Sequence, residues 1–503
     1  MTQPTLLGRV SGAVPWALVA RAVRLASAIV TSVVIVRSLG IHDYGLLALV
    51  RVTMAFLALP VGVGMGQALL RFLPELAVRS GGRGGRRLLV TGLVVQLSAW
   101  AALSLAVFLA RDAFDAFFKA DLAGYVLLAT LLLLVGSLRG FFDSALTASY
   151  DMRRLALLGT IGSIVQLAAT WSFLAGGAGI AGVLIATAVG ELVPTLGAMR
   201  RAFAVFREPV EAIAPRRLFG YSLPFVFLSV LNMITWKQSE TIFLGHFHSA
   251  ELAGLFDLAY KLPQQLLEFV PDAIWPLVLA AMSESYTKNR EGLRRLVDLY
   301  YRLLFLIVPP LSLFGIVFGD RILAVLYPGA EWAPAGIYCQ ILFGVFSLSF
   351  FGTPLSMAIY VLEKSWANFL LALLFAAINL GLDLVLIPRF GLVGAIIPVT
   401  IAIGISPIAR WFAVRALMGS VSIPWRFIGR AYLVSLPLVA LAPFRDRVDS
   451  VPALFGAGVA AAAIVFASIR VFGLLSATER DLIARSKLPL KGALLRVFAG
   501  SPA

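Results

Sequence analysis

Apolar segments long enough to cross a membrane recur along almost the entire sequence, from Val14 to Phe472. A helix needs about 20 predominantly apolar residues to span the hydrocarbon core of a bilayer. Of the 503 residues, 60% are hydrophobic and only 14% are charged, whereas soluble domains carry about 25% charged residues. A soluble core of this size could not enclose so much apolar surface, so the excess must face lipid. The sequence therefore predicts an all-α integral membrane protein.

The apolar segments divide into about 14 predicted transmembrane helices. Arginine and lysine concentrate in every second loop between them, for example at Arg86–Arg87 and Arg216–Arg217. The positive-inside rule assigns these loops, and with them both termini, to the cytoplasm. The same distribution explains most of the formal net charge of +16 without a nucleic-acid partner. The expected spans are 14–36, 46–70, 88–110, 122–148, 155–175, 179–199, 218–244, 252–282, 298–318, 334–360, 366–387, 391–412, 428–444 and 451–473.

The sequence also repeats itself at an offset of about 205 to 212 residues. The end of one segment, Val36–Gly40, matches Ile242–Gly245, and Gly179–Val183 matches Gly391–Ala395. Two six-helix halves of even helix number would both enter from the cytoplasm, as in parallel repeats, which place a substrate site between the halves. We expect three parts: residues 1–205, residues 206–420 as a repeat of the first, and residues 421–503 with two additional helices and a basic tail.

Three motifs in the same order resemble those of a known transporter superfamily. They are VRSLGIHDYGLLALV (Val36–Val50), LGHFHSAELAGLFDLAYKL (Leu244–Leu262) and NLGLDLVLIPRFGLVGA (Asn379–Ala395). They resemble the multidrug/oligosaccharidyl-lipid/polysaccharide exporter superfamily, specifically its polysaccharide transporter (O-antigen flippase-like) family. The resemblance implies a V-shaped, two-bundle transporter in a bacterial inner membrane. It would expose a central cavity alternately to the two sides and flip a polyprenyl-diphosphate-linked oligosaccharide.

Several polar and charged residues lie within the predicted spans, where an isolated charge costs roughly 2.5–3.5 kcal/mol. A water-filled cavity is a less costly location than lipid, and guanidinium and ammonium groups there could bind a diphosphate. Trp236 could stack on a sugar ring. The candidate substrate-binding residues are Arg21, Arg24, Arg51, Asn232, Trp236, Lys237, Glu240, Asp257 and Lys261.

Structural roles are the alternative for some of these residues and for other charged side chains. Arg51 could extend to the membrane interface, and Asp257 and Lys261 could be an i, i+4 pair. Arg139 and Asp143 are expected to be solvated or paired, like Glu75. Glu191 and Asp383 are expected to form hydrogen bonds inside a bundle, with proton coupling as the alternative. The pair His246 and His248 lacks further ligands for a metal site.

No GxxxxGK[ST] phosphate loop occurs in the sequence, so transport is expected to use the membrane potential or a coupling ion, H⁺ or Na⁺, and no cofactor. A multidrug or cation antiporter of the same superfamily, or a lipid II flippase, is the alternative. An antiporter for cations should favour anionic cavity residues. An integral-membrane polymerase or ligase would need a larger catalytic outer loop than this sequence offers, so we expect a transporter and not an enzyme.

Overall fold

The structure is a computed structural model of the whole chain, and it describes residues 6–62, 64–79, 84–149, 151–210, 213–236, 239–288, 290–362, 364–419 and 421–474. Within these ranges every regular element is a helix, and the β-type contact found there is an isolated bridge between Gly84 and Glu208. Helices satisfy their backbone N–H and C=O groups internally, as hydrocarbon surroundings require. The predicted all-α membrane class is confirmed, while the number of crossings and the internal repeat stay predictions.

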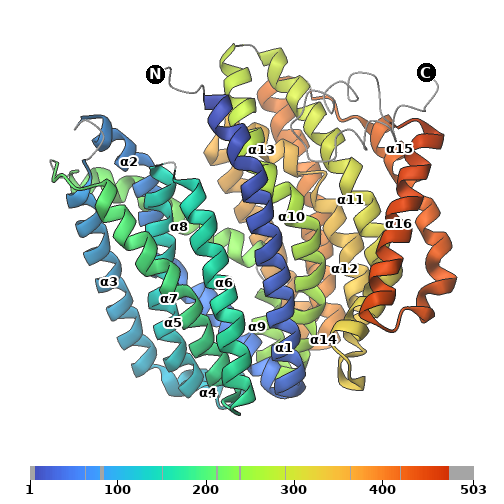
Figure 1. Cartoon of the computed structure of the whole chain (residues 1–503), viewed down its shortest axis with the longest axis horizontal. Helices are drawn as coiled ribbons and strands as arrows, with labels where there is room; N and C mark the ends of the chain where they lie inside the picture. The colour runs from blue at the N-terminus through green and yellow to red at the C-terminus, as the bar shows by residue number, and fades with distance from the viewer. Residues whose placement is uncertain are drawn as a thin grey trace. The chain divides into compact units, whose positions relative to one another are not determined.

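Packing divides the chain into two units. The N-terminal unit comprises Gly12–Gly254 and Leu380–Ala395. In this unit α5 and α6 both pack on α7, and α2 and α3 both pack on α5, as Figure 1 shows. Its helices are most of α1 (Leu6–Gly62), then α2 (Met65–Arg79), α3 (Arg86–Leu109), α4 (Arg111–Phe118), α5 (Ala123–Ala148), α6 (Met152–Ala175), α7 (Gly179–Val205), α8 (Pro215–Trp236) and α9 (Ser239–Phe247).

The C-terminal unit comprises Met1–Ser11, Leu255–Asn379 and Ile396–Ala503. Helix α11 packs on α12 and also on the last two helices, α15 and α16, which lie side by side in Figure 1. The helices that contribute to this unit are α10 (Ala250–Lys288), α11 (Arg290–Leu326), η1 (Ala330–Trp332), α12 (Ala335–Ser349), α13 (Thr353–Val361), α14 (Ser365–Met418), α15 (Trp425–Ser435), η2 (Leu436–Arg447) and α16 (Val451–Phe472). The predicted divisions at residues 205 and 420 stay predictions.

Two of the longest helical runs turn at a glycine. Helix α1 is interrupted at Gly40, with φ 70° and ψ 171°, and α14 at Gly391, with φ 54° and ψ −124°. A positive φ of this size is readily adopted only by glycine, because other residues meet a Cβ clash. Gly40 lies between the predicted spans 14–36 and 46–70, and Gly391 is the first residue of the predicted span 391–412, so the chain turns at both places with hardly any loop.

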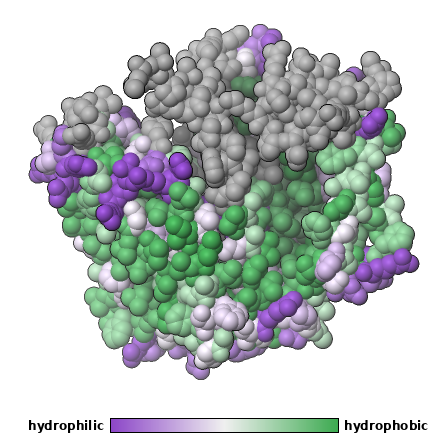
Figure 2. All heavy atoms as spheres, viewed as in Figure 1, coloured by the Kyte–Doolittle hydropathy of each residue, from purple (hydrophilic) through white to green (hydrophobic). Residues whose placement is uncertain are grey.

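Apolar side chains cover the outside of the helical bundles. Among the described residues, ten helical runs are long and apolar enough to cross a membrane, including the runs Arg21–Ala77 and Trp366–Met418 that contain the glycine turns. Figure 2 shows a broad hydrophobic surface on the N-terminal unit between hydrophilic margins. Exposed apolar residues such as Leu109 and Trp171 therefore face the lipid. Helix α9, with nine residues, is too short to be one of the ten runs.

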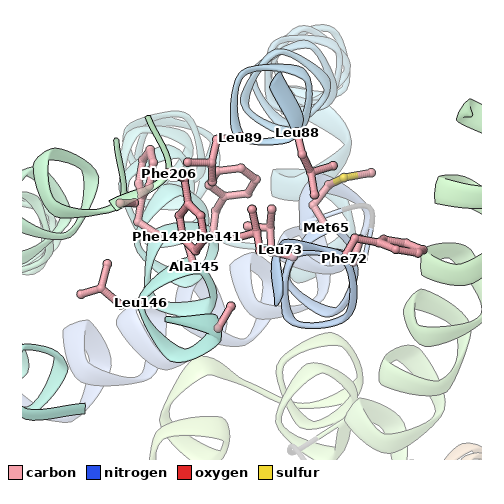
Figure 3. Close-up of a cluster of buried hydrophobic side chains, with 14 of the residues drawn as sticks. Met65, Phe72, Leu73, Leu88, Leu89, Phe141, Phe142, Ala145, Leu146 and Phe206 are labelled. Atoms are coloured by element: carbon pink, nitrogen blue, oxygen red, sulfur yellow. The ribbon is translucent and has the colours of Figure 1, made fainter. Parts of the chain in front are cut away.

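A dense aromatic and aliphatic core holds one end of the N-terminal unit together (Figure 3). Phe141 and Phe142 of α5 pack edge to face with ring centroids 5.2 Å apart. They lie among Leu73 of α2, Leu89 of α3 and Phe206, which follows α7. Side chains from these three segments thus fix α5, and this packing holds Arg139 and Asp143 of α5 in place.

The last helices are tied to the C-terminal unit by polar contacts at both ends. Arg430 of α15 donates to the carbonyl oxygens of Phe472 and Gly473, each at 2.8 Å. At the other end, Arg445 pairs with Asp320 at 3.2 Å, and Arg321 pairs with Asp446. The two hydrogen bonds from Arg430 satisfy carbonyl groups at the end of α16 that have no partner within the helix.

Candidate functional site in the N-terminal unit

Arg24 of α1 lies against α6 at Gly159. A Cβ atom built on Gly159 would be 2.8 Å from the Nη1 atom of Arg24 and 3.6 Å from its Cδ atom. One turn further along α1, the Ser27 hydroxyl donates to the carbonyl oxygen of Ser163 at 2.9 Å. The polar face of α1 therefore packs on α6, and the missing side chain at residue 159 leaves room for the guanidinium.

A second guanidinium, from Arg139 of α5, approaches the same position. Its Nη2 atom is 3.6 Å from the Cβ built on Gly159. The Nε atom of Arg139 pairs with the Oδ2 atom of Asp143 at 2.6 Å. Arg139 and Asp143 were expected to be solvated or paired, and the structure pairs them with each other. Their approach to Arg24 was missed, because it depends on how α5 and α6 pack against α1.

The charged groups of this cluster are not all paired with one another. Arg24 and Arg139 lie beside Asp143 and near the partly buried Glu191 of α7, and Arg21 acts on Arg24 but also has a further interaction of its own. The Oδ2 atom of Asp143 is taken by Arg139, and its buried Oδ1 atom has no hydrogen bond within the described structure. Arg24 itself has no hydrogen-bond or ion-pair partner among the described residues. The cluster thus presents an uncompensated guanidinium, which is suited to hold an anion.

Two acidic side chains of the same unit are buried close together. Glu240 of α9 and Asp383 of α14 are 1% and 0% exposed, and their charges interact. The hydroxyl of Ser239 donates to the Oδ2 atom of Asp383 at 3.3 Å. Two ionised carboxylates repel each other at such a place, and each of the two has a further interaction of its own. Glu240 was predicted to bind substrate, and its proximity to Asp383, 143 residues later, has no sequence signal.

The remaining predicted residues occupy separate places. In the C-terminal unit, the Nζ atom of Lys261 is 2.6 Å from the Oδ2 atom of the buried Asp257, so the i, i+4 pair is confirmed. Arg51 is partly buried on α1, beyond Gly40. The side chains of Asn232 and Trp236, and the whole of Lys237, lie outside the described residues. The substrate-binding role of all nine residues stays a prediction. In the described part, no group of three or more His, Cys, Asp or Glu side chains is arranged to hold a metal ion.

Comparison with known proteins gives relatives of the same kind along most of the chain. A protein of Haloferax volcanii named "Probable flippase AglR" is 22% identical over 396 residues, which are 77% of this chain and 79% of the relative. Another from the same organism, "Probable low-salt glycan biosynthesis flippase Agl15", is 20% identical over 374 residues, 74% of this chain and 76% of the relative.

Among solved structures, the lipid II flippase MurJ in an inward closed conformation matches with a TM-score of 0.67 at 16% identity, covering 91% of this chain and 98% of MurJ. At this identity the likeness shows the fold alone, and it confirms the predicted all-α membrane-transporter fold class, while the helix count and the repeats stay predictions. The model of the family described as "polysaccharide biosynthesis protein" matches residues 34–336. This match covers the charged parts of α5 and α7 and the Glu240 segment. The chain therefore belongs to the polysaccharide biosynthesis protein family, as a multi-pass membrane protein with the fold of that transporter superfamily.

Proposed function

We propose that this protein is a flippase. It would move a polyprenyl-diphosphate-linked oligosaccharide from the inner to the outer leaflet of the cytoplasmic membrane by alternating access, for the synthesis of a polysaccharide. The observation that carries the proposal is the uncompensated guanidinium of Arg24, held beside Arg139 at Gly159. The family and the flippase names of the two relatives from Haloferax volcanii agree with it.

The chemistry of the substrate suits this arrangement. A diphosphate carries several acceptor oxygens, and guanidinium groups donate to such oxygens in pairs. Within a membrane a charge is costly, so an unpaired arginine is retained where it has an anion to bind. The glycan would occupy the central cavity that the family resemblance implies, where Trp236 could stack on a sugar ring. The polyprenyl tail would stay in the lipid. Arg21, Arg51, Lys237 and Lys261 would extend the cationic surface.

Energy for transport would come from the charge of the substrate in the membrane potential and from an ion bound by the acidic pair of Glu240 and Asp383. An anionic headgroup moving outward in an inside-negative cell gains about 2.3 kcal/mol per charge for each 100 mV. We further propose that Glu240 and Asp383 hold the coupling ion, H⁺ or Na⁺, because a bound cation relieves the repulsion of two buried carboxylates. With the basic loops on the cytoplasmic side, both termini would also be cytoplasmic.

A reconstituted flipping assay tests the proposal. Wild-type protein, Arg24→Ala and Arg295→Ala are compared in liposomes that contain a fluorescent polyprenyl-diphosphate sugar. Arg295 is a matched control because its side chain is 81% exposed. We expect Arg24→Ala to lower the rate at least tenfold, the scale of a lost charge-assisted hydrogen bond of about 1.5–3 kcal/mol, and Arg295→Ala to leave it unchanged. Equal rates in all three proteins would overturn the assignment of Arg24.

A multidrug or cation antiporter and a lipid II flippase are the alternatives of the same fold class. The excess of guanidinium groups near Arg24 would repel a cationic drug, so it favours the anionic substrate. Competition in the same assay separates the two flippase substrates: unlabelled lipid II would slow transport of the labelled oligosaccharide lipid only if both are recognised. Transport of a cationic dye with no flipping of either lipid would establish the antiporter instead.

A further inference from the structure

A second arginine without a carboxylate partner lies in the C-terminal unit, at Arg410 of α14. The Cζ atom of Arg410 lies over the ring of Phe375, 5.2 Å from its centroid. The Nη1 atom is 3.1 Å from a Cβ atom built on Gly352, the residue before α13. The guanidinium therefore occupies the space of a missing side chain, as that of Arg24 does at Gly159, but all three residues belong to the C-terminal unit.

The surroundings of Arg410 give its N–H groups no acceptor. Among the described residues no hydrogen bond or ion pair reaches this guanidinium, and its Nε atom is buried. The contact with Phe375 stabilises a cation, but the face of a ring supplies no oxygen atom for five N–H donors. Arg410 also lies within the run Trp366–Met418, which is apolar enough to cross a membrane. An unpaired charge is costly there, so an anion is needed to compensate it.

Two hydroxyl groups near Arg410 also have no hydrogen-bond partner in the described part of the chain. Ser406 lies one helical turn before Arg410, on the same face of α14, and its Oγ atom is buried. Thr400 of the same helix donates to the carbonyl oxygen of Ile396 at 2.8 Å, as helical hydroxyls often do, whereas Ser406 makes no such bond. Tyr360 of α13 is close enough to interact electrostatically with Arg410. Three donor side chains thus gather without an acceptor.

Aromatic side chains indicate that Arg410 lies near one membrane interface. Trp411 follows it directly, and α14 ends at Met418, two turns later. Trp366, in the first turn of α14, is 69% exposed. Tryptophan is enriched at the depth of lipid headgroups. A long arginine side chain at this depth can reach a headgroup phosphate.

The charge of these groups distinguishes between phosphate ligands. Arg410 brings one positive charge, and the hydroxyls of Ser406 and Tyr360 bring none. A phosphodiester group carries one negative charge and is matched by a single guanidinium. The diphosphate of a polyprenyl-linked sugar carries more charge than one arginine compensates. The balance of charge therefore favours the phosphodiester of an ordinary bilayer lipid.

We propose that Arg410, Ser406 and Tyr360 bind the phosphodiester headgroup of an anionic bilayer lipid. The guanidinium donates to the phosphate oxygens, and the two hydroxyls complete the set of donors. The leaflet is the one predicted to be cytoplasmic, whose anionic lipids attract cationic side chains. This lipid site is separate from the substrate position proposed at Arg24 and does not depend on transport.

Thermal unfolding in a non-ionic detergent tests the lipid site. The full-length protein is titrated with short-chain phosphatidylglycerol, or with phosphatidylcholine of the same chain length, whose net charge is zero. A ligand that binds the folded protein raises the apparent Tm with its concentration, which gives an apparent Kd. We expect a saturable rise with phosphatidylglycerol. Arg410→Gln should weaken this Kd at least tenfold, and Tyr360→Phe, which keeps the ring, about three- to tenfold.

Arg415→Gln is the matched control. Arg415 also lies over an aromatic ring of α14, that of Trp411 at 5.1 Å, but it is exposed. This variant should keep the Kd of the wild type. Without lipid, Arg410→Gln should be at least as stable as the wild type, because it removes an unpaired charge.

Other results would overturn the lipid site. A purely structural Arg410 predicts that Arg410→Gln lowers the Tm without lipid and leaves the Kd unchanged. If Arg410→Gln does not fold, an unchanged Kd in Tyr360→Phe would overturn the site as well. Equal effects of the two phospholipids would exclude recognition of the anionic headgroup. Saturation by inorganic phosphate at the same concentrations, or by a polyprenyl-diphosphate sugar and not by phosphatidylglycerol, would exclude a bilayer lipid as the ligand.

Discussion

A methyl group at residue 45 should separate α1 from the start of α10. The Cβ atom of an alanine there would lie 2.0 Å from the carbonyl oxygen of Ala250, 2.4 Å from its carbonyl carbon and 3.1 Å from the nitrogen of Glu251. A carbon and an oxygen in close contact approach to about 3.3 Å. The gap must therefore widen by more than 1 Å, and the obstacle is backbone that cannot rotate away.

The energetic cost sets the size of the expected effect. Overpacking of a close contact costs about 1–3 kcal/mol, which is about a 5- to 150-fold change in the closed population. Because Glu251 is the next residue after Ala250, its hydrogen bond to His42 should be lost as well. In Gly45→Ala, the hydrogen-exchange rate of the backbone amides of residues 250–254 should rise by at least fivefold, and the apparent Tm should fall.

Gly62→Ala is the control in the same helix. No heavy atom lies within 4 Å of a Cβ built on Gly62, and its φ is not positive. Alanine favours a helix over glycine by up to about 1 kcal/mol, so this variant should keep the exchange rate of residues 250–254 and should not lower the Tm. If Gly45→Ala matched Gly62→Ala in both measurements, the close contact at Ala250 would be refuted.

Four further changes probe the charged groups. Gly159→Leu should displace the guanidinium of Arg24 and lower the flipping rate several-fold in the liposome assay. Gly140→Leu is the control and should leave the flipping rate unchanged, because no atom lies within 4 Å of a Cβ at residue 140. Asp143→Asn should lower the stability by about 1–3 kcal/mol, because it leaves the guanidinium of Arg139, which is 11% exposed, without its carboxylate partner. The double variant Asp143→Asn with Arg139→Gln should recover part of the lost apparent Tm. Asp383→Asn should abolish the dependence of flipping on the H⁺ or Na⁺ gradient, because an amide cannot take up a proton or replace the carboxylate charge; flipping is measured with and without each gradient. The pKa of Glu251 is lowered in the folded protein, so its ionised form stabilises the fold fully above about pH 4.3, the pKa of a free glutamate. This stabilisation is lost as the pH falls through the lowered pKa of the folded protein. A scan of Tm against pH should show the loss in wild type and not in Glu251→Gln.

Hydropathy predicted the membrane class because length and apolarity are local properties of each segment. The turns at Gly40 and Gly391 were less evident, since both glycines lie in segments that read as ordinary boundaries between helices. The pairs Arg139–Asp143 and Asp257–Lys261 could be anticipated from their i, i+4 spacing on a helix. The meeting of Arg139 with Arg24, and of Glu240 with Asp383, could not, because it requires the packing of helices far apart in the sequence.

The charged residues inside the helices fall into two groups: those with an oppositely charged partner one helical turn away, and those without one. Lys261 has Asp257 one turn away, and Arg139 has Asp143, so each of these pairs is close to neutral as a unit. Arg24 has no such neighbour: the next charged residue along α1 is Arg21, which adds to its charge. An arginine in a membrane helix costs roughly 2.5–3.5 kcal/mol, and a structural role would be served better by a paired or an uncharged residue. The unpaired charge is therefore the feature that best distinguishes a binding position from a structural one. It ranks Arg24 above Lys261 as the residue whose removal should impair transport with the smallest effect on folding.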